Sequence, residues 1–406
     1  MSSPGSLLLR QDSCHLPYDD IHSAEMSVLG ALLLDQGCTP KVTALITEDD
    51  FFLERNRIIF ALLVTLHAEN IPADLVTVCN RLKKEGNLER AGGGSYLAEL
   101  LLSKGYEVHG IVRRVAIEDP EHRLGRIQHI LDRLTLHAGS LESYASMHAV
   151  VRRSAPHECY HLAAQSFVSY SFEDEFSTLN TNINGTHYLL SALKSEAPDC
   201  RFYFAASSEM FGRAEETPQH ERTRFHPRSA YGISKVAGYE LTRNYREAHQ
   251  LHASSGILFN HESPRRGFEF VSRKITSAVA RIAAGRGGKL KLGNLEARRD
   301  WGYAPEYVEA MWIMLQQPEA DDYVVATGET HSVRDFAELA FSHAGLDWRE
   351  HVEIDAVLYR AAEVEVLLGD ASKARRVLGW TPRTSFDGLV RSMVDADLAL
   401  AAGRRS

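Results

Sequence analysis

The stretch GGGSYLAELLLSKGYEVHGIVRR, residues 92–114, decides the fold. It begins with three glycines, continues as a short apolar helix that Gly105 ends, and enters a β-branched strand that ends on two arginines. In this order, a glycine turn, a helix and a strand are the later parts of a dinucleotide-binding βαβ unit. The strand that should precede the turn is missing, because residues 80–91 (NRLKKEGNLERA) are charged and typical of a helix.

Composition excludes several classes of protein. The chain has 406 residues, 44% of them hydrophobic, and a formal net charge of −9, which gives no support to a broad nucleic-acid or anionic-membrane surface. Its five cysteines are far apart without a CxxC pair, so we expect neither a metal site nor a disulfide framework, and a reducing cytoplasm is the simplest location. The first residues, MSSPGSLLLRQDSCH, predict no signal peptide, and no apolar run is long enough to predict a membrane span.

The chain changes style within the glycine cluster. Residues 23–94 have helical periodicity, whereas residues from 106 onward alternate β-branched runs with helical stretches such as 142–153 and 182–195. This alternation predicts an α/β fold, a Rossmann-like doubly wound parallel sheet with a smaller substrate domain, preceded by an all-α domain. The predicted strands are 106–112, 133–139, 158–166, 201–209 and 252–260.

Residues 17–98 resemble the N-terminal domain of bacterial replicative DNA helicases. The resemblance rests on PYDDIHSAEMSVLGALLLD, EDDFFLERNRIIFALLVTLH and PADLVTVCNRLKKEGNLERAGG. It implies a helical module with a role in ring assembly and in contact with a primase-type protein. We expect no helicase motor activity, since the chain lacks a GxxxxGK[ST] phosphate loop.

A second resemblance covers residues 94 to about 400, which are similar to the GDP-mannose 4,6-dehydratases of the extended short-chain dehydrogenase/reductase family. It implies conversion of GDP-mannose to GDP-4-keto-6-deoxymannose, NADP as cofactor and a homo-oligomer. The expected domains are a disordered tail at 1–16, the helical domain at 17–93, the cofactor domain at 94–262 and a substrate domain at 263–400, with 294–312 returning to the cofactor domain. The motifs that carry the resemblance are 94–114, HLAAQS (161–166), SSEMFG (207–212), PRSAYGISKVAG (227–238), GILFNHESPRRG (256–267), 293–312, YVVATGETHSVR (323–334) and 367–386.

Four residues are the catalytic candidates. Tyr231 and Lys235 are four positions apart on a predicted helix and share one face, so that an ammonium could stabilise a phenolate. Ser207 and Glu209 close a predicted strand, at the edge where parallel sheets place ligands. The resemblance implies that Tyr231 takes the proton of the sugar O4 and Glu209 that of C5. The alternatives are a surface pair for Tyr231 and Lys235 and an exposed carboxylate for Glu209.

The cofactor candidates extend from the glycine turn to the NHESPRRG motif. Arg113 and Arg114 end the strand after the turn, where arginine accommodates a 2′-phosphate and so favours NADP, although a solvated basic pair is the alternative. His261 could also be an ordinary buried histidine. The remaining cofactor candidates are Gly93, Gly94, Ser140, Leu141, Leu162, Ala163, Ala164, Gln165, Ser166, Lys235 and Arg266.

A further set of residues is expected to bind the substrate. A sugar nucleotide carries a diphosphate, which calls for several basic and hydrogen-bonding side chains. The candidates are Asn260, Lys274, Arg299, Arg360 and Glu363.

The missing strand would lie in the centre of the sheet, between the second and fourth strands of the 3-2-1-4-5-6 order. Two ways to accommodate its loss remain open: residues 75–79 (LVTVC) could be recruited as a strand, or the sheet could close imperfectly around the glycine turn. The rival to the dehydratase is a catalytically inert fusion that acts as an assembly module. Joined reading frames are a third explanation.

Overall fold

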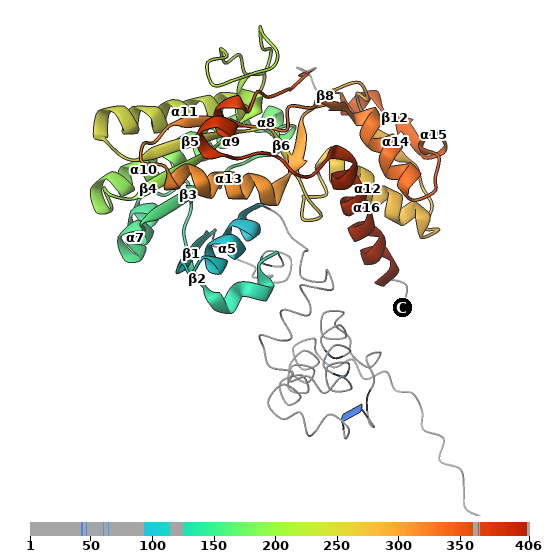
Figure 1. The fold of residues 1–406 in the computed structure, drawn as a ribbon, viewed down its shortest axis with the longest axis horizontal. Coiled ribbons are helices and arrows are strands. Elements are labelled where there is room, and N and C mark those ends of the chain that lie inside the picture. Colours follow the sequence, from blue (N-terminus) through green and yellow to red (C-terminus); the bar gives the residue numbers. More distant parts are fainter. Residues whose placement is uncertain are drawn as a thin grey trace, which may run out of the picture. The chain divides into compact units, whose positions relative to one another are not determined.

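The computed structural model describes most of the dehydratase-like part of the chain (Figure 1). The chain forms two compact units, residues 1–89 and 90–406. Most of residues 1–92 lie outside the described residues. The predicted helical domain and the strand considered for residues 75–79 therefore lie outside them as well. The described residues are 42, 43, 46, 60, 64, 93–113, 124, 126–359, 364 and 366–403.

The stretch quoted above folds as its pattern predicts. Helix α5 (Gly93–Ser103) ends before Gly105, whose φ of +84° is the left-handed conformation that glycine adopts without strain. Strand β1 (Val108–Val112) follows and pairs in parallel with β2 (Leu134–Ala138). These two strands form a sheet of their own.

The other predicted strands form a second parallel sheet. Its order is β10-β5-β4-β3, with β3 (Glu158–His161), β4 (Arg201–Ser207), β5 (Ala253–Leu258) and β10 (Asp322–Val325). Strands β4 and β5 are almost wholly buried, as a sheet covered on both faces requires. All five predicted strands are therefore confirmed.

Helices cover both faces of this sheet (Figure 1). One layer contains α7 (Tyr144–Ser154), α10 (Gly185–Glu196) and α11 (Ala230–His249), and the other contains α5 and α13 (Ala304–Gln316). The doubly wound architecture expected from the sequence is thus present.

The sheet is interrupted where the first strand is missing. In a doubly wound order that strand would lie between β1 and β3, and the described residues contain no strand in that position. Side chains connect the two parts instead: the Tyr106 hydroxyl donates to Glu158 at 2.9 Å and accepts from Trp312 Nε1 at 3.2 Å. Gln316 donates to the same Glu158 oxygen at 2.9 Å.

A second hydrophobic core lies beside the first. It is built on α12 (Val271–Ala283), α14 (Val333–His343) and α16 (Phe386–Gly403), together with the paired strands β7 (Leu290–Leu292) and β12 (Val352–Ile354). Asp397 joins α16 to α12, since it pairs with Arg273 at 2.7 Å and accepts from Thr276 at 2.6 Å. The first hydrophobic core is the one formed by the main sheet and its covering helices, and residues of α13 and β10 belong to it.

Short elements complete the described chain. None of the described helices is long and apolar enough to cross a membrane. Strand β6 pairs with β9 and β8 with β11. The bounds are η3 Gln128–Arg133, α8 Tyr170–Glu173, α9 Glu175–Leu179, η4 Asn180–Asn184, η5 Ser208–Met210, β6 Asn260–Glu262, β8 Arg298–Arg299, β9 Trp301–Tyr303, β11 His331–Ser332, α15 Trp348–His351, η6 Ala356–Leu358 and η7 Ala374–Leu378.

The interrupted sheet predicts uneven local stability. A two-stranded sheet is marginal without tertiary support, so the substitution Tyr106→Phe, which removes the hydroxyl between Glu158 and Trp312, should loosen β1 and β2. The lost hydrogen bonds are worth about 1 kcal/mol each, and we expect amide protection in 108–112 and 134–138 to fall about tenfold by hydrogen exchange. The exposed Tyr144→Phe serves as control. Equal loss of protection in β4 and β5 would contradict the prediction.

Candidate active site

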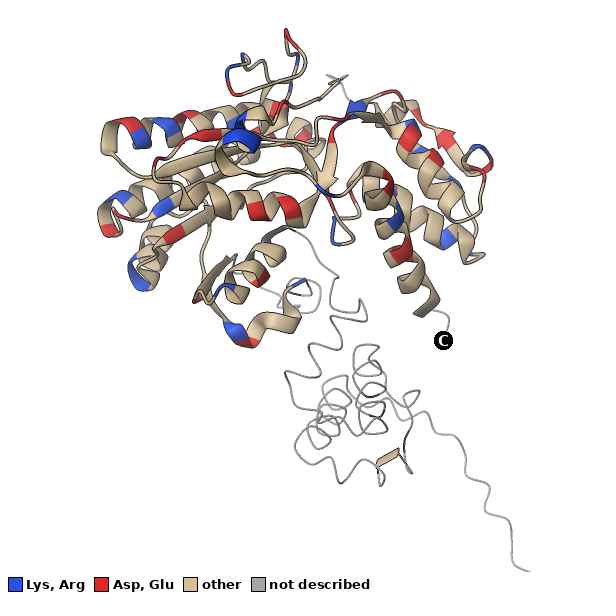
Figure 2. Cartoon of the chain, viewed as in Figure 1, with Lys and Arg blue, Asp and Glu red and all other residues tan. Residues whose placement is uncertain are grey.

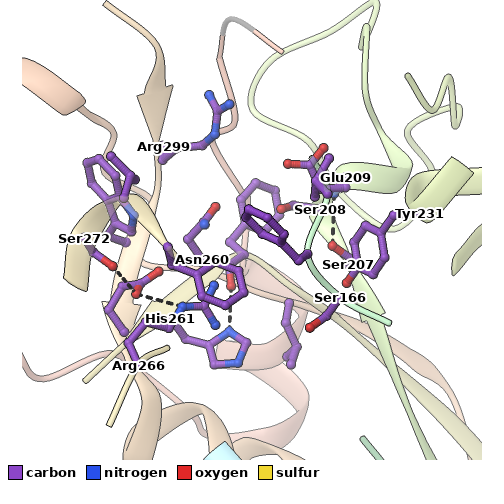
Figure 3. A pocket seen from close by; sticks show the side chains of 18 of the residues that line it. Ser166, Ser207, Ser208, Glu209, Tyr231, Asn260, His261, Arg266, Ser272 and Arg299 are labelled. Carbon is purple, nitrogen blue, oxygen red and sulfur yellow. Dashed lines mark hydrogen bonds and ion pairs between the residues drawn. The ribbon is translucent and has the colours of Figure 1, made fainter. Parts of the chain in front are cut away.

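A cavity of 510 Å³ opens at the carboxyl ends of β4 and β5 (Figure 3). Parallel sheets place ligands at this edge, because the strands end there and the loops after them converge. One side of the cavity is formed by residues after β3 and β4 and by α11, and the other by β6, α12 and the segment around β8.

Figure 2 shows acidic and basic residues distributed over the whole fold, without a broad basic face in the part that is drawn in colour.

Helix α11 supplies Tyr231 and Lys235. The helix begins behind Ser229, whose hydroxyl accepts from Gly232 N at 3.0 Å, and both candidate side chains are buried and line the cavity. Lys235 Nζ donates to the Ala205 carbonyl at 2.7 Å and lies 5.8 Å from the centre of the Tyr231 ring. The surface-pair alternative therefore does not fit this placement.

The electrostatics of this pair follow from burial. Burial raises the pKa of Tyr231 to about 12, although a hydrogen bond with Ser207 and the charge of Arg266 act to lower it. Burial also lowers the pKa of Lys235 to about 8, because a low-dielectric surrounding disfavours the ammonium. Both pKa shifts favour the uncharged forms of Tyr231 and Lys235. Nearby charged groups must therefore stabilise the phenolate when Tyr231 gives up its proton.

Ser207 and Glu209 follow from the end of β4. The Ser207 hydroxyl accepts from Glu209 N at 3.2 Å and starts the short η5 turn that places Glu209 in the cavity wall. A side chain at Gly232 would bring its Cβ within 2.8 Å of the Glu209 carbonyl oxygen. Only glycine therefore lets α11 approach this turn so closely.

The opposite side of the cavity is formed by the NHESPRRG motif. His261 Nδ1 lies 2.9 Å from the Phe259 carbonyl, which fixes the proton on Nδ1, and the ring stacks on Tyr307 with 5.0 Å between centroids. Burial lowers the pKa of His261 to about 4, so the imidazole is neutral. Arg266 lies over the Phe270 ring at 3.5 Å and pairs with Glu262.

The three diphosphate candidates belong to the same cavity as the catalytic candidates. Asn260, Lys274 and Arg299 all line the cavity. Arg299 Nη1 donates to the Val364 carbonyl at 2.7 Å, and its neighbour Asp300 accepts from Thr327 N at 2.8 Å. Burial lowers the pKa of Lys274, and the charge of Asp355 raises it.

The predicted residues thus fall into three groups. Twelve line the cavity: Leu162, Ala164, Ser166, Ser207, Glu209, Tyr231, Lys235, Asn260, His261, Arg266, Lys274 and Arg299. Five do not line it: Arg113, Ser140, Leu141, Ala163 and Gln165. Gly93 and Gly94 begin α5, and their place relative to the cavity lies outside what the structure describes. Arg114, Arg360 and Glu363 lie outside the described residues.

Several other residues that line the cavity were not selected from the sequence pattern. Phe167, Phe270 and Asn294 belong to loops or helix starts whose place at the cavity depends on the tertiary fold. Glu262 and Asn294 nevertheless lie within quoted motifs: Glu262 within NHESPRRG, where Asn260, His261 and Arg266 were selected, and Asn294 within 293–312, where Arg299 was selected.

Arg265 has a different role from its neighbour Arg266. Its side chain is 1% exposed and pairs with Glu99 of α5 at 2.8 Å, and Nη1 donates to the Ser95 hydroxyl at 2.9 Å. The guanidinium also lies over the Tyr96 ring, 4.1 Å from its centre. One arginine of the pair therefore anchors the helix after the glycines, while the other lines the cavity.

Comparison with known proteins agrees with this arrangement. The family model described as GDP-mannose 4,6 dehydratase matches residues 93–393, and that of the DnaB-like helicase N terminal domain matches residues 17–109. GDP-mannose 4,6 dehydratase 1 of Arabidopsis thaliana is 50% identical over 317 residues, which cover 76% of this chain and 87% of the relative. The Homo sapiens GDP-mannose 4,6 dehydratase is 46% identical over 334 residues, 76% of this chain and 89% of the relative.

Solved structures show the same fold. RMD from Pseudomonas aeruginosa, solved with NADPH, has a TM-score of 0.63 and 24% identity, covering 76% of this chain and 96% of that structure. DesIV from Streptomyces venezuelae, a dTDP-glucose 4,6-dehydratase, has a TM-score of 0.66 and 21% identity, covering 75% and 92%. Together, the family match over 93–393 and the relatives at 46–50% identity show that this chain belongs to the GDP-mannose 4,6-dehydratase family.

Proposed function

We propose that the chain is an NADP-dependent GDP-mannose 4,6-dehydratase, a lyase that removes water from the mannose unit and leaves GDP-4-keto-6-deoxymannose. The observation that carries the proposal is the convergence of Ser207, Glu209, Tyr231 and Lys235 on one cavity. A tyrosine, a lysine and a carboxylate at one site are the groups that proton removal from an alcohol and then from a carbon beside a carbonyl requires.

The residues present fit the nicotinamide half of the cofactor. Ala164, Ser166, Lys235 and His261 line the same cavity as Tyr231, and the neutral His261 offers Nε2 as an acceptor without adding charge. When bound there, NADP would accept a hydride from C4 and later return this hydride to C6. The choice of NADP over NAD rests on Arg113 and Arg114 alone.

The fit at the pyrophosphate half is poorer. Ser95 of α5 and Arg113, which would lie near the phosphates, do not line the cavity. We therefore expect weaker cofactor binding than a complete glycine-rich turn between two strands would give.

Tyr231 is the base for the sugar O4 in this proposal. Its phenolate takes up the O4 proton, and the Ser207 hydrogen bond and the Arg266 charge favour this phenolate because both lower the pKa of Tyr231. Lys235, held by the Ala205 carbonyl, keeps its position beside the ring. Loss of the O4 proton and of the hydrogen on C4 turns that carbon into a ketone.

Glu209 acts next in this proposal. The C4 ketone makes the C5 proton acidic, and the Glu209 carboxylate removes it. The C6 hydroxyl then leaves as water by taking up a proton, the hydride removed from C4 is added back at C6, and C5 takes up a proton. The sum of these steps is the loss of one water molecule.

Substrate and partners complete the proposal. Asn260, Lys274 and Arg299 bind the diphosphate of GDP-mannose, and Arg360 and Glu363 are further substrate-binding residues. A homo-oligomer, contact of residues 17–93 with a primase-type protein and a location in the cytoplasm remain proposals that rest on the sequence.

The direct test is turnover by the full-length chain. Purified protein with added NADP⁺ should consume GDP-mannose and yield a product lighter by one water, which mass spectrometry detects. Calorimetry should show NADP⁺ binding. Failure of both would leave the inert assembly module as the better account of the chain.

Glu209→Gln should separate the catalytic steps from binding. The amide cannot remove the C5 proton, so we expect turnover to fall by roughly 10²- to 10⁴-fold, with GDP-mannose affinity within about twofold of wild type. Incorporation of solvent deuterium at C5 should be lost as well. The exposed Glu215→Gln is the matched control, and a normal rate in Glu209→Gln would exclude the assigned role.

Burial of Lys235 predicts a pH dependence of stability. Its pKa is lowered from 10.5 to about 8 by burial, so the unfolded chain binds more protons between these values. The free energy of unfolding of wild type, relative to Lys235→Met, should therefore rise with pH across this window, by about 3 kcal/mol at 1.36 kcal/mol per unit. Urea unfolding of both proteins below and above the window measures it, and a constant difference would contradict the assignment.

A further inference from the structure

A buried carboxylate lies in the wall of the cavity opposite Tyr231. Glu262, the last residue of β6, is 2% exposed, and its Oε2 accepts from Ser272 Oγ at 2.5 Å (Figure 3). The same oxygen lies 3.1 Å from Arg266 Nε. The Asn260 side chain is a further hydrogen-bonding partner of this carboxylate. Glu262 therefore connects β6, the turn after it and the start of α12.

Burial makes these contacts interdependent. Burial raises the pKa of Glu262, while the charge of Arg266 and the hydrogen bonds of Ser272 and Asn260 lower it. A carboxylate without water is stable only when its charge is paired and its oxygens accept hydrogen bonds. Removal of the negative charge would therefore leave Arg266 without its partner.

Arg266 has little freedom in this arrangement. Phe270 covers its guanidinium at 3.5 Å, and Nε lies 3.1 Å from Glu262 Oε2 in an ion pair. The two terminal nitrogens of the guanidinium are the groups that remain to meet a ligand in the cavity, which Arg266 lines. A planar fork held at its base is well suited to an anionic ligand.

We infer that Glu262 is a positioning residue, which holds Arg266 and Asn260 in the cavity wall so that they meet the anionic ligands of the dehydratase in one fixed geometry. The inference rests on the proposed function, because it assigns Glu262 a part in that site. Glu262 itself reaches the ligands through Arg266 and Asn260.

The test uses the full-length chain and four variants. Glu262→Gln keeps the size and removes the charge, Glu262→Asp keeps the charge on a shorter side chain, and Arg266→Lys is made alone and together with Glu262→Gln. Glu309→Gln is the matched control, since it breaks the exposed ion pair of Glu309 with Arg383 away from the cavity. NADP⁺ and GDP-mannose are titrated separately by calorimetry, and thermal unfolding is recorded without ligand.

A positioning role predicts a pattern that loss of stability alone would not produce. Glu262→Gln should raise the Kd for NADP⁺ about tenfold, or about 1.4 kcal/mol, with Glu262→Asp in between and Glu309→Gln within twofold of wild type. The double variant should bind NADP⁺ about as weakly as Arg266→Lys alone, because both changes disrupt the same contact between Glu262 and Arg266. Unchanged affinity in Glu262→Gln, or additive losses in the double variant, would overturn the inference.

The ligand-free measurement separates the two proposals. If wild type binds neither NADP⁺ nor GDP-mannose, the proposed function fails, and thermal unfolding still tests the contact. Non-additive shifts of Tm for the Glu262→Gln and Arg266→Lys pair would then support the positioning of Arg266 by Glu262. Additive shifts would overturn it.

Discussion

In a continuous sheet, the facing edges of β1 and β3 would each form backbone hydrogen bonds with a strand that lies between them. The whole cofactor side of this fold depends on this need for backbone partners. Each buried peptide group without a partner costs about 1 to 3 kcal/mol, so the edges of β1 and β3 cannot both be buried in an empty slot. The structure avoids this cost by dividing the sheet: β1 and β2 pair with each other, and β3 has an edge position, where Glu158, Cys159 and Tyr160 are only partly buried.

Side chains then hold the two parts together. Tyr106, Glu158 and Trp312 make hydrogen bonds across the interruption, and Arg265 fixes the first turn of α5 through Ser95 and Glu99. These contacts are polar and few, so they stabilise the position of α5 and β1 without restoring a continuous sheet.

Sequence patterns predicted the parts of the fold that depend on local periodicity. The run 201–209 became β4 (Arg201–Ser207), and the four-residue spacing of Tyr231 and Lys235 placed both on one face of α11. The separate roles of Arg265 and Arg266 could not be predicted, since adjacent arginines are equivalent until the tertiary fold directs one to α5 and the other to the cavity. The missing first strand was predictable, because charged residues replaced the expected β-branched run.

The proposed catalytic residues lie on the complete side of the interruption. Ser207 and Glu209 follow β4, and Tyr231 and Lys235 lie on α11, which packs on β4 and β5. Those strands pair with each other and with β10, so their carboxyl ends are fixed by hydrogen bonds that do not involve β1. The chemistry of proton removal and the binding of the cofactor phosphates are therefore carried by different parts of the sheet. Loss of the first strand directly affects binding of the cofactor phosphates. It affects proton removal only indirectly, because the cofactor must reach the same cavity.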